Sequence, residues 1–155
     1  MSIEDRIVQL GLVLPEAPAP LANYVLARVS GAHLYLSGHL GKRDGTVVTG
    51  KVDADVNRTD AYELARTAAI EMLASARVAL GTLDRIRGVV KVVGFVNSSP
   101  DFTDQPAIVN GASDLLVEVF GPEHGKHARS AVGVAQLPRG AVVEVEAVFE
   151  IGSED

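Results

Sequence analysis

One stretch of the sequence, from about Asp55 to Leu80, constrains the fold more than any other, because its apolar residues recur at the spacing of a single helix face. These apolar positions are Ala65, Ala68, Ala69, Met72, Leu73, Ala76, Ala79 and Leu80. Most of them are alanine, and a narrow stripe of small side chains indicates a helix that lies close against a sheet. Gly81 follows at the position of a helix C-cap, where glycine adopts a left-handed backbone without a Cβ clash. We therefore expect one long helix that ends at Leu80.

Two further segments continue this pattern. Residues Val89–Val96 are almost continuous in valine and phenylalanine, which is typical of a strand buried on both faces. A second helix is expected from about Asp104, because Pro106 then falls in its first turn, where proline is tolerated. Its end is expected at Gly121-Pro122, which cannot continue a helix. The middle of the chain therefore predicts a helix, a buried strand and a second helix.

The remaining strands are expected in two pairs. The runs Tyr24–Val29 and His33–Ser37, separated by three residues that include Gly31, predict a hairpin. The runs Ser130–Val134 and Val142–Ile151 predict two C-terminal strands joined through a Leu-Pro turn. In the last strand, apolar residues alternate with glutamates, so one of its faces is expected to be wet or to look into a cleft.

This order of elements predicts an α/β (α+β) fold with one mixed β-sheet and two helices packed on one face. Residues 41–50 are expected to add loops around one short strand. The other face of the sheet is left uncovered, so we expect its apolar residues to be buried by association into an oligomer. Residues 2–10 predict a short helix, and the three prolines that follow it force an extended lead-in. The chain thus divides into an N-terminal segment, residues 1–21, and one domain, residues 22–152.

Composition and charge exclude several classes of site. The 155 residues include no cysteine, which excludes disulfides, thiolate catalysis and zinc–thiolate or iron–sulfur centres. The formal net charge of −6 disfavours nonspecific binding of nucleic acid. The first residues are charged and lack the apolar run of a signal peptide, and no stretch approaches the ~20 apolar residues of a membrane span. We expect a cytoplasmic protein with no membrane contact.

Metal and cofactor sites are not expected either. None of the four histidines forms the i, i+4 helical pair that a metalloenzyme would use. Residues 121–127 approach a phosphate-loop pattern, but the first glycine is one residue too close and His127 stands in place of the magnesium-binding hydroxyl.

One pair of residues is suited to chemistry. Arg129 is expected to open a strand directly after a loop that holds His124 and His127, and Glu144 lies on the following strand among apolar residues. If the two strands are adjacent, or meet across subunits, the guanidinium could bind a substrate carboxylate while the Glu144 carboxylate holds and deprotonates a water. The alternative is an ordinary surface ion pair, worth at most about 1 kcal/mol.

Four more residues stay open between a structural and a functional role. Tyr24, at the expected start of a strand, is typical of half-buried packing, and Asn110 is typical of a solvated helix position. Ser37 and Gly38 fit a tight turn at a strand end.

The C-terminal segment resembles the signature of the RidA/YjgF family. Residues 129–147 read Arg-Ser-Ala-Val-Gly-Val-Ala-Gln-Leu-Pro-Arg-Gly-Ala-Val-Val-Glu-Val-Glu-Ala, and the family pattern is an arginine, two strands, a Leu-Pro turn and a Val-Glu-x-Glu-Ala ending. Asn23-Tyr24 followed by residues 34–38 is similar to the family's opening hairpin. Residues 95–102 followed by Val109-Asn110 are similar to its stretch before the second helix. The resemblance runs in order over about residues 22–151.

This resemblance implies a chorismate-mutase-like fold and a homotrimer whose strands enclose a central barrel, with three clefts between subunits. It also implies hydrolysis of reactive enamine and imine intermediates to 2-oxo acids and ammonia, without metal or cofactor. Arg129 would bind the carboxylate of a small metabolite, and Glu144 would position the attacking water. The resemblance assigns the lining of the pocket to Tyr24, Ser37, Gly38, Asn110 and Ala131.

Two departures from the family pattern leave the function open. Val25-Leu26 follows the tyrosine where the deaminating members usually carry Ser-Gln, and Ala131 stands where cysteine or threonine is frequent. The alternatives to a deaminase are a trimer that binds a small carboxylate without catalysis, and a protein that cleaves RNA or inhibits translation. The acidic net charge disfavours the RNA alternative.

Overall fold

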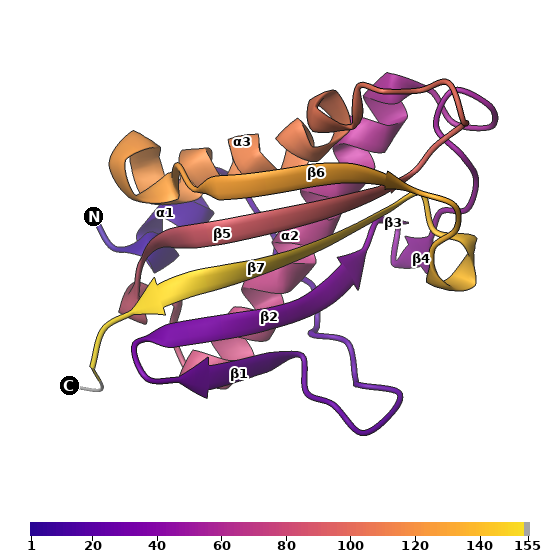
Figure 1. The fold of residues 1–155 in the computed structure, drawn as a ribbon. Helices are drawn as coiled ribbons and strands as arrows, with labels where there is room; N and C mark the ends of the chain where they lie inside the picture. Colours follow the sequence, from indigo (N-terminus) through magenta and orange to yellow (C-terminus); the bar gives the residue numbers. More distant parts are fainter. Residues whose placement is uncertain (154–155) are drawn as a thin grey trace.

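The computed structural model describes residues 1–153, and their backbone forms one mixed five-stranded sheet with helices on one side (Figure 1). The strands lie in the order β1-β2-β7-β5-β6. Only β5 and β6 are parallel, and every other neighbouring pair is antiparallel. The bounds of the strands are β1 Ala27–Ser30, β2 His33–Leu40, β5 Ile86–Asn97, β6 Ala128–Val134 and β7 Val143–Ile151. The expected α/β fold with one mixed sheet is confirmed.

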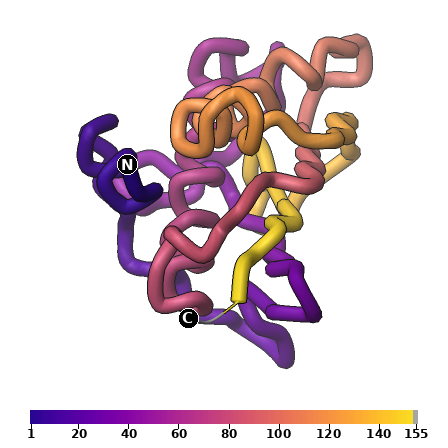
Figure 2. The backbone as a smooth tube through the Cα atoms, turned by 90° about the vertical axis from the view of Figure 1, so that its left-hand side faces the viewer, coloured from indigo at the N-terminus to yellow at the C-terminus, as the bar shows by residue number. Residues whose placement is uncertain are grey.

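Three α-helices, two 3₁₀ helices (Leu83–Arg85 and Pro138–Gly140) and a small hairpin complete the described chain. The bounds are α1 Ile3–Gln9, α2 Arg58–Leu80 and α3 Gln105–Gly125, with β3 Lys42–Arg43 paired to β4 Thr46–Val47. Figures 1 and 2 show α2 and α3 on the same side of the sheet, with the short α1 beside them. The core therefore lies between these helices and one face of the sheet, and its largest fully buried side chains include Phe149, Leu34, Met72, Ile108 and Leu115.

Helix α2 ends at the residue that its sequence predicts, Leu80. Asn57 caps its N-terminus by accepting a hydrogen bond from the Asp60 backbone N–H at 2.8 Å. Gly81 ends it with φ 80°, the left-handed conformation expected of a C-cap. The stripe is buried from Ala65 to Ala76 against the sheet and α3, so the helix approaches its neighbours closely there, whereas Ala79 in the last turn is exposed.

The closest approach of α2 to α3 occurs at Gly111. A Cβ added there would lie 2.9 Å from the backbone carbon of Tyr62 and 3.1 Å from the backbone nitrogen of Arg66. Glycine is required at this position because the two helix backbones touch. Further along α3, Gly121 leaves the helical conformation, with φ 81° and ψ 167°, so the break expected at Gly121-Pro122 is a kink followed by one more turn.

Three details differ from the sequence expectations. Strand β5 is buried only on its helix side, because Lys91, Val93 and Phe95 are half-exposed on the open face of the sheet. Residues 41–50 form the β3–β4 hairpin and not a single short strand. Tyr24 lies before β1, which begins only at Ala27, so it does not start a strand.

The open face carries apolar side chains that no element of the described chain covers. Tyr35 is 51% exposed and Val132 43% exposed, and they lie beside the half-exposed Val93, Phe95 and Val148. Exposing a contiguous apolar patch to water is unfavourable in free energy, so this face of the sheet is suited to association with other copies of the chain.

Candidate functional site

Arg129 and Glu144 lie on opposite faces of the sheet. Arg129 is in register with Val92, which is fully buried under the helices, and residues directly opposite each other point to the same face. Glu144 is in register with Phe95, three residues further along β5, and so points to the open face. Strand β5 also separates β6 from β7, so the expectation that the two strands are adjacent is wrong. The expectation that the two residues meet across subunits stays a prediction.

The Arg129 guanidinium is held by helix α3. Its Nη1 donates to Asn110 Oδ1 at 2.8 Å and to Ser113 Oγ at 3.1 Å. Asn110 and Ser113 are three residues apart on α3 and therefore share one helix face. Both acceptors use the same nitrogen, so among residues 1–153 no hydrogen bond occupies Nη2 or Nε, and these two nitrogens can bind a carboxylate.

His127 extends this network behind Ser113. Its Nδ1 lies 2.7 Å from the Gly125 carbonyl oxygen, which can only accept, so Nδ1 carries the proton. Nε2 then accepts from the Ser113 hydroxyl at 2.9 Å. Burial lowers the pKa of His127, a backbone hydrogen bond to Gly125 opposes this, and the Arg129 charge lowers it further. The neutral ring thus orients the Ser113 hydroxyl so that its oxygen faces Arg129.

The Glu144 carboxylate lies directly over Gly38. A Cβ added at Gly38 would be 2.8 Å from Glu144 Cδ and 3.0 Å from its Cγ, so only glycine leaves room for this side chain. Gly38 falls within the irregular register of β2 and β7 between Leu36 and His39. Burial, and secondarily the Glu146 carboxylate on the same face, raise the pKa of Glu144. A carboxyl group with a raised pKa is suited to acid–base work near neutral pH.

Glu144 lines a hollow of about 450 Å³ at the end of the sheet where β2 meets the Leu-Pro turn. Tyr24 and Gly38 line it as well, so three of the expected site residues are brought together. Neither Arg129 nor Asn110 belongs to its lining. The other lining residues are Pro18, Ala19, Leu21, Leu26, His39, Leu40, Lys42, Glu71, Pro138 and Arg139.

Besides Asn110, two further expected pocket residues do not line this hollow. The Ser37 hydroxyl donates to the Val25 carbonyl at 2.6 Å and thereby fixes the segment that enters β1. Ala131 is in register with Gly94 and packs against the helix-side core.

The hollow contains residues that the sequence analysis missed. Lys42 Nζ and Glu71 Oε1 form an ion pair at 2.7 Å, with only 24% and 8% of the two side chains exposed. His39 is 2% exposed; its Nδ1 donates to the Ser37 carbonyl at 2.7 Å, and its Nε2 accepts from Ser75 Oγ at 2.8 Å. Burial lowers the pKa of His39, so the ring is neutral. The sequence holds one local signal for this ion pair, the charged Glu71 directly beside the apolar Met72 of an alanine-rich helix.

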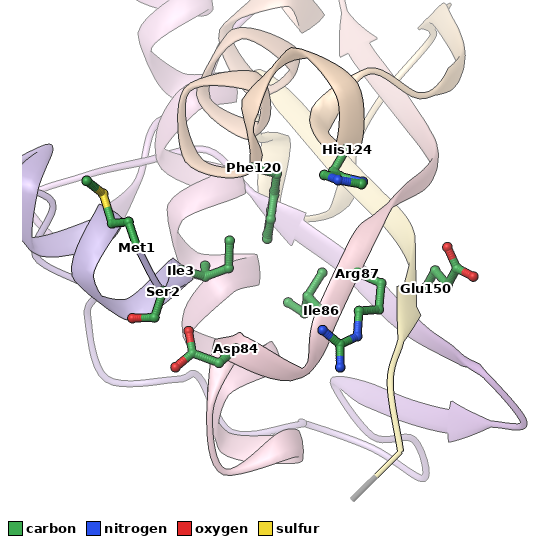
Figure 3. A pocket seen from close by; sticks show the side chains of 9 residues that line it. All are labelled: Met1, Ser2, Ile3, Asp84, Ile86, Arg87, Phe120, His124 and Glu150. Atoms are coloured by element: carbon green, nitrogen blue, oxygen red, sulfur yellow. The ribbon is translucent and has the colours of Figure 1, made fainter. Parts of the chain in front are cut away.

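His124 does not approach the candidate site. It lies on the rim of a separate hollow of about 570 Å³ between α1 and the end of α3 (Figure 3). That hollow is lined by Met1, Ser2, Ile3, Asp84, Ile86, Arg87, Phe120, His124 and Glu150, none of which is an expected site residue.

Comparison with known proteins places the chain in a family. Residues 4–150 match the family model described as "YjgF/chorismate mutase-like, putative endoribonuclease". This chain belongs to the RidA/YjgF family. It is 50% identical to Protein TCP17 of Trypanosoma cruzi over 97% of this chain and 95% of that protein. It is also 34% identical to the 2-iminobutanoate/2-iminopropanoate deaminase of Dermatophagoides farinae, over 88% of this chain and 92% of that protein.

The fold of the RidA/YjgF family is found again among solved structures. The structure of Atu1372 from Agrobacterium tumefaciens has a TM-score of 0.88 with 46% identity, over 97% of this chain and 92% of that one. Within residues 1–153, no helix is long and apolar enough to cross a membrane. In the same residues, no group of three or more histidine, aspartate or glutamate side chains is placed to hold a metal ion.

Proposed function

We propose that this protein hydrolyses reactive 2-imino acids, and the enamines in equilibrium with them, to 2-oxo acids and ammonia. The observation that carries the proposal is the pair of half-sites: a guanidinium positioned by Asn110 and Ser113 on one face, and a carboxylate of raised pKa beside a hollow on the other. Family membership and the 34% identity to a 2-iminobutanoate/2-iminopropanoate deaminase support the same reaction class.

The two halves act together only if they come from different copies of the chain. Because Arg129 and Glu144 point to opposite faces of one sheet, no single chain can present both to one small substrate. A cyclic homotrimer, joined through the open apolar face, would bring Arg129 of one copy to Glu144 of the next and form three equivalent clefts. Such an assembly would also bury Tyr35 and Val132, which are exposed in the single chain.

The reaction needs little from the protein. The Arg129 guanidinium binds the substrate carboxylate through two parallel hydrogen bonds and places the imine carbon beside Glu144. Ionised Glu144 accepts a proton from a water as the water oxygen bonds to the imine carbon, and it passes this proton to the imine nitrogen, which gives a carbinolamine. Glu144 then takes the proton of the carbinolamine hydroxyl and delivers it to the amino nitrogen. The C–N bond breaks, ammonia leaves with the bonding pair, and the carbonyl of the 2-oxo acid forms. No redox step is involved.

The activity is tested with 2-iminopropanoate generated from serine by a dehydratase. Purified protein is expected to accelerate pyruvate release over a buffer control, and the Arg129→Ala and Glu144→Gln variants are each expected to lose this acceleration. Failure of the wild-type protein to accelerate pyruvate release contradicts the proposed activity.

The location of the site between copies is tested by mixing the two inactive variants. Random exchange of subunits in an equal mixture creates an intact Arg129–Glu144 combination at about one quarter of the interfaces of a cyclic assembly. We therefore expect about one quarter of the wild-type activity to return after mixing and exchange. If both residues served a cleft within one chain, mixing would restore nothing.

A further inference from the structure

The lining of the hollow beside Glu144 includes a pair of charged side chains that the proposed reaction does not use. Lys42 and Glu71 form their ion pair there at 2.7 Å, largely withdrawn from solvent. Removing two charges from water costs several kcal/mol per ion, and the attraction between them offsets this cost only in part. Apolar residues of similar volume often stabilise a fold as well as a buried ion pair does, so stability alone is a weak explanation of the pair.

The Lys42–Glu71 ion pair retains hydrogen-bonding groups that no described residue occupies. The Lys42 ammonium has three N–H donors, and within the described chain one of them is used on Glu71 Oε1. Glu71 Oε2 accepts no hydrogen bond from the described residues, and Glu71 lines the hollow. The ion pair therefore presents the remaining Lys42 N–H donors beside the Glu71 Oε2 acceptor, and the two side chains together carry no net charge.

The remaining walls are suited to a short apolar chain. Leu26, Leu40 and Pro138 line the hollow together with Pro18 and Leu21 from the N-terminal segment. The neutral His39 has both ring nitrogens occupied and adds no charge. A volume of about 450 Å³ is larger than the methyl group of 2-iminopropanoate needs.

From this arrangement we infer that the hollow receives the side chain of the substrate and selects one that ends in a carboxamide. The inference rests on the proposed function and names its substrate class: 2-imino acids derived from amide-bearing amino acids. The amide carbonyl accepts from Lys42 Nζ, and the amide nitrogen donates to Glu71 Oε2. A carboxylate of the same shape is repelled by Glu71 and Glu144. An isobutyl group leaves the remaining Lys42 donors and Glu71 Oε2 without hydrogen-bond partners, so both side chains are disfavoured.

Three imines of nearly equal shape test this selectivity. An L-amino-acid oxidase with catalase generates them from asparagine, leucine and aspartate, whose side chains end in an amide, an isopropyl group and a carboxylate, respectively. We expect kcat/KM for the asparagine-derived imine to exceed that for each of the other two by at least about 10-fold. Equal values, or a preference for the leucine- or aspartate-derived imine, overturn the inference.

A double variant shows whether the ion pair is responsible. Lys42→Met/Glu71→Met removes both charges together and so leaves no unpaired buried ion. It is expected to lose the preference for the amide, so that kcat/KM for the asparagine-derived imine no longer exceeds kcat/KM for the leucine-derived imine. The matched control, Arg66→Met/Glu118→Met, removes a 2.9 Å ion pair between α2 and α3 that does not line the hollow, and it is expected to keep the preference. Survival of the preference in Lys42→Met/Glu71→Met overturns the inference.

Failure of the selectivity is distinguishable from failure of the proposed reaction. If no imine is hydrolysed faster than in buffer, the proposed function is wrong, and calorimetry with freshly prepared 2-oxo acids decides the selectivity by itself. We then expect 2-oxosuccinamate to bind at least about 10-fold more tightly than 4-methyl-2-oxopentanoate or oxaloacetate, and this difference to vanish in Lys42→Met/Glu71→Met. Equal affinities overturn the inference on this readout.

Discussion

A single methyl group at Gly38 should disable the Glu144 carboxylate without unfolding the protein. In the Gly38→Ala variant the new Cβ would lie 2.8 Å from Glu144 Cδ, whereas carbon atoms in contact are separated by about 3.5 Å or more. The carboxylate must therefore retreat by about 0.7 Å or more. Because Glu144 is a flexible side chain, it can move while the backbone stays in place.

A displacement of this size has a predictable effect on the rate. Misplacing a catalytic group by about 1 Å can cost about 100-fold, so we expect kcat for 2-iminopropanoate hydrolysis to fall by about 10- to 100-fold. Substrate binding through Arg129 is unaffected by the change, so KM should move little. The variant should unfold at the same urea concentration as the wild type.

The assay combines steady-state kinetics with urea unfolding, and the chain offers a matched control. At Gly133 an added Cβ would lie 2.6 Å from Gln105 Nε2, again the end of a flexible polar side chain, but away from Glu144. Gly133→Ala is therefore expected to retain activity. The reasoning is refuted if Gly38→Ala keeps its activity within two-fold, or if both variants lose it to the same extent.

Three other changes test the packing, the electrostatics and the guanidinium network. Gly111→Ala forces α2 and α3 apart, and we expect the free energy of unfolding in urea to fall by about 2 kcal/mol. The reason is that an overpacking cost of about 3 kcal/mol exceeds the gain of about 1 kcal/mol in helix propensity. An increase in the urea concentration at the unfolding midpoint would contradict this. The raised pKa of Glu144 means that the folded state disfavours its charge, so stability is lost as the pH rises from the ordinary carboxyl pKa through the raised one. Glu144→Gln should therefore be more stable than the wild type at pH 7, with no difference below about pH 4, and equal unfolding curves at pH 7 would be evidence against this burial effect. Ser113→Ala removes one of the two oxygens that accept hydrogen bonds from Arg129. We expect KM to rise by about 3- to 10-fold with kcat nearly unchanged, as the loss of one hydrogen bond implies. A fall in kcat with KM unchanged would contradict a role of Ser113 in positioning Arg129.

Local patterns in the sequence determined most of the secondary structure. The alanine stripe and Gly81 predicted α2 to its last residue, because helix periodicity and a left-handed cap are properties of consecutive residues. The alternation of apolar residues and glutamates predicted that Glu144 leaves the core, since side chains alternate along any strand. Both features are local, so they needed no knowledge of the rest of the chain.

The candidate site was only partly predictable for the same reason. Sequence pointed to Arg129 and Glu144, but the face on which each lies depends on strand order and register, which are set by pairing between distant segments. Likewise, the contact of Lys42 with Glu71 joins residues 29 positions apart, and no spacing rule indicates it.

The sequence by itself determined the helices, the strands and the chemical groups available to this protein, because these follow from short-range periodicity and residue type. Only the tertiary structure decided that the Arg129 guanidinium and the Glu144 carboxylate lie on opposite sides of one sheet. It alone also decided that the largely buried Lys42–Glu71 ion pair lines the hollow beside Glu144. The physical reason is that the packing of β5 between β6 and β7 fixes which side chains meet, and this packing depends on the whole chain.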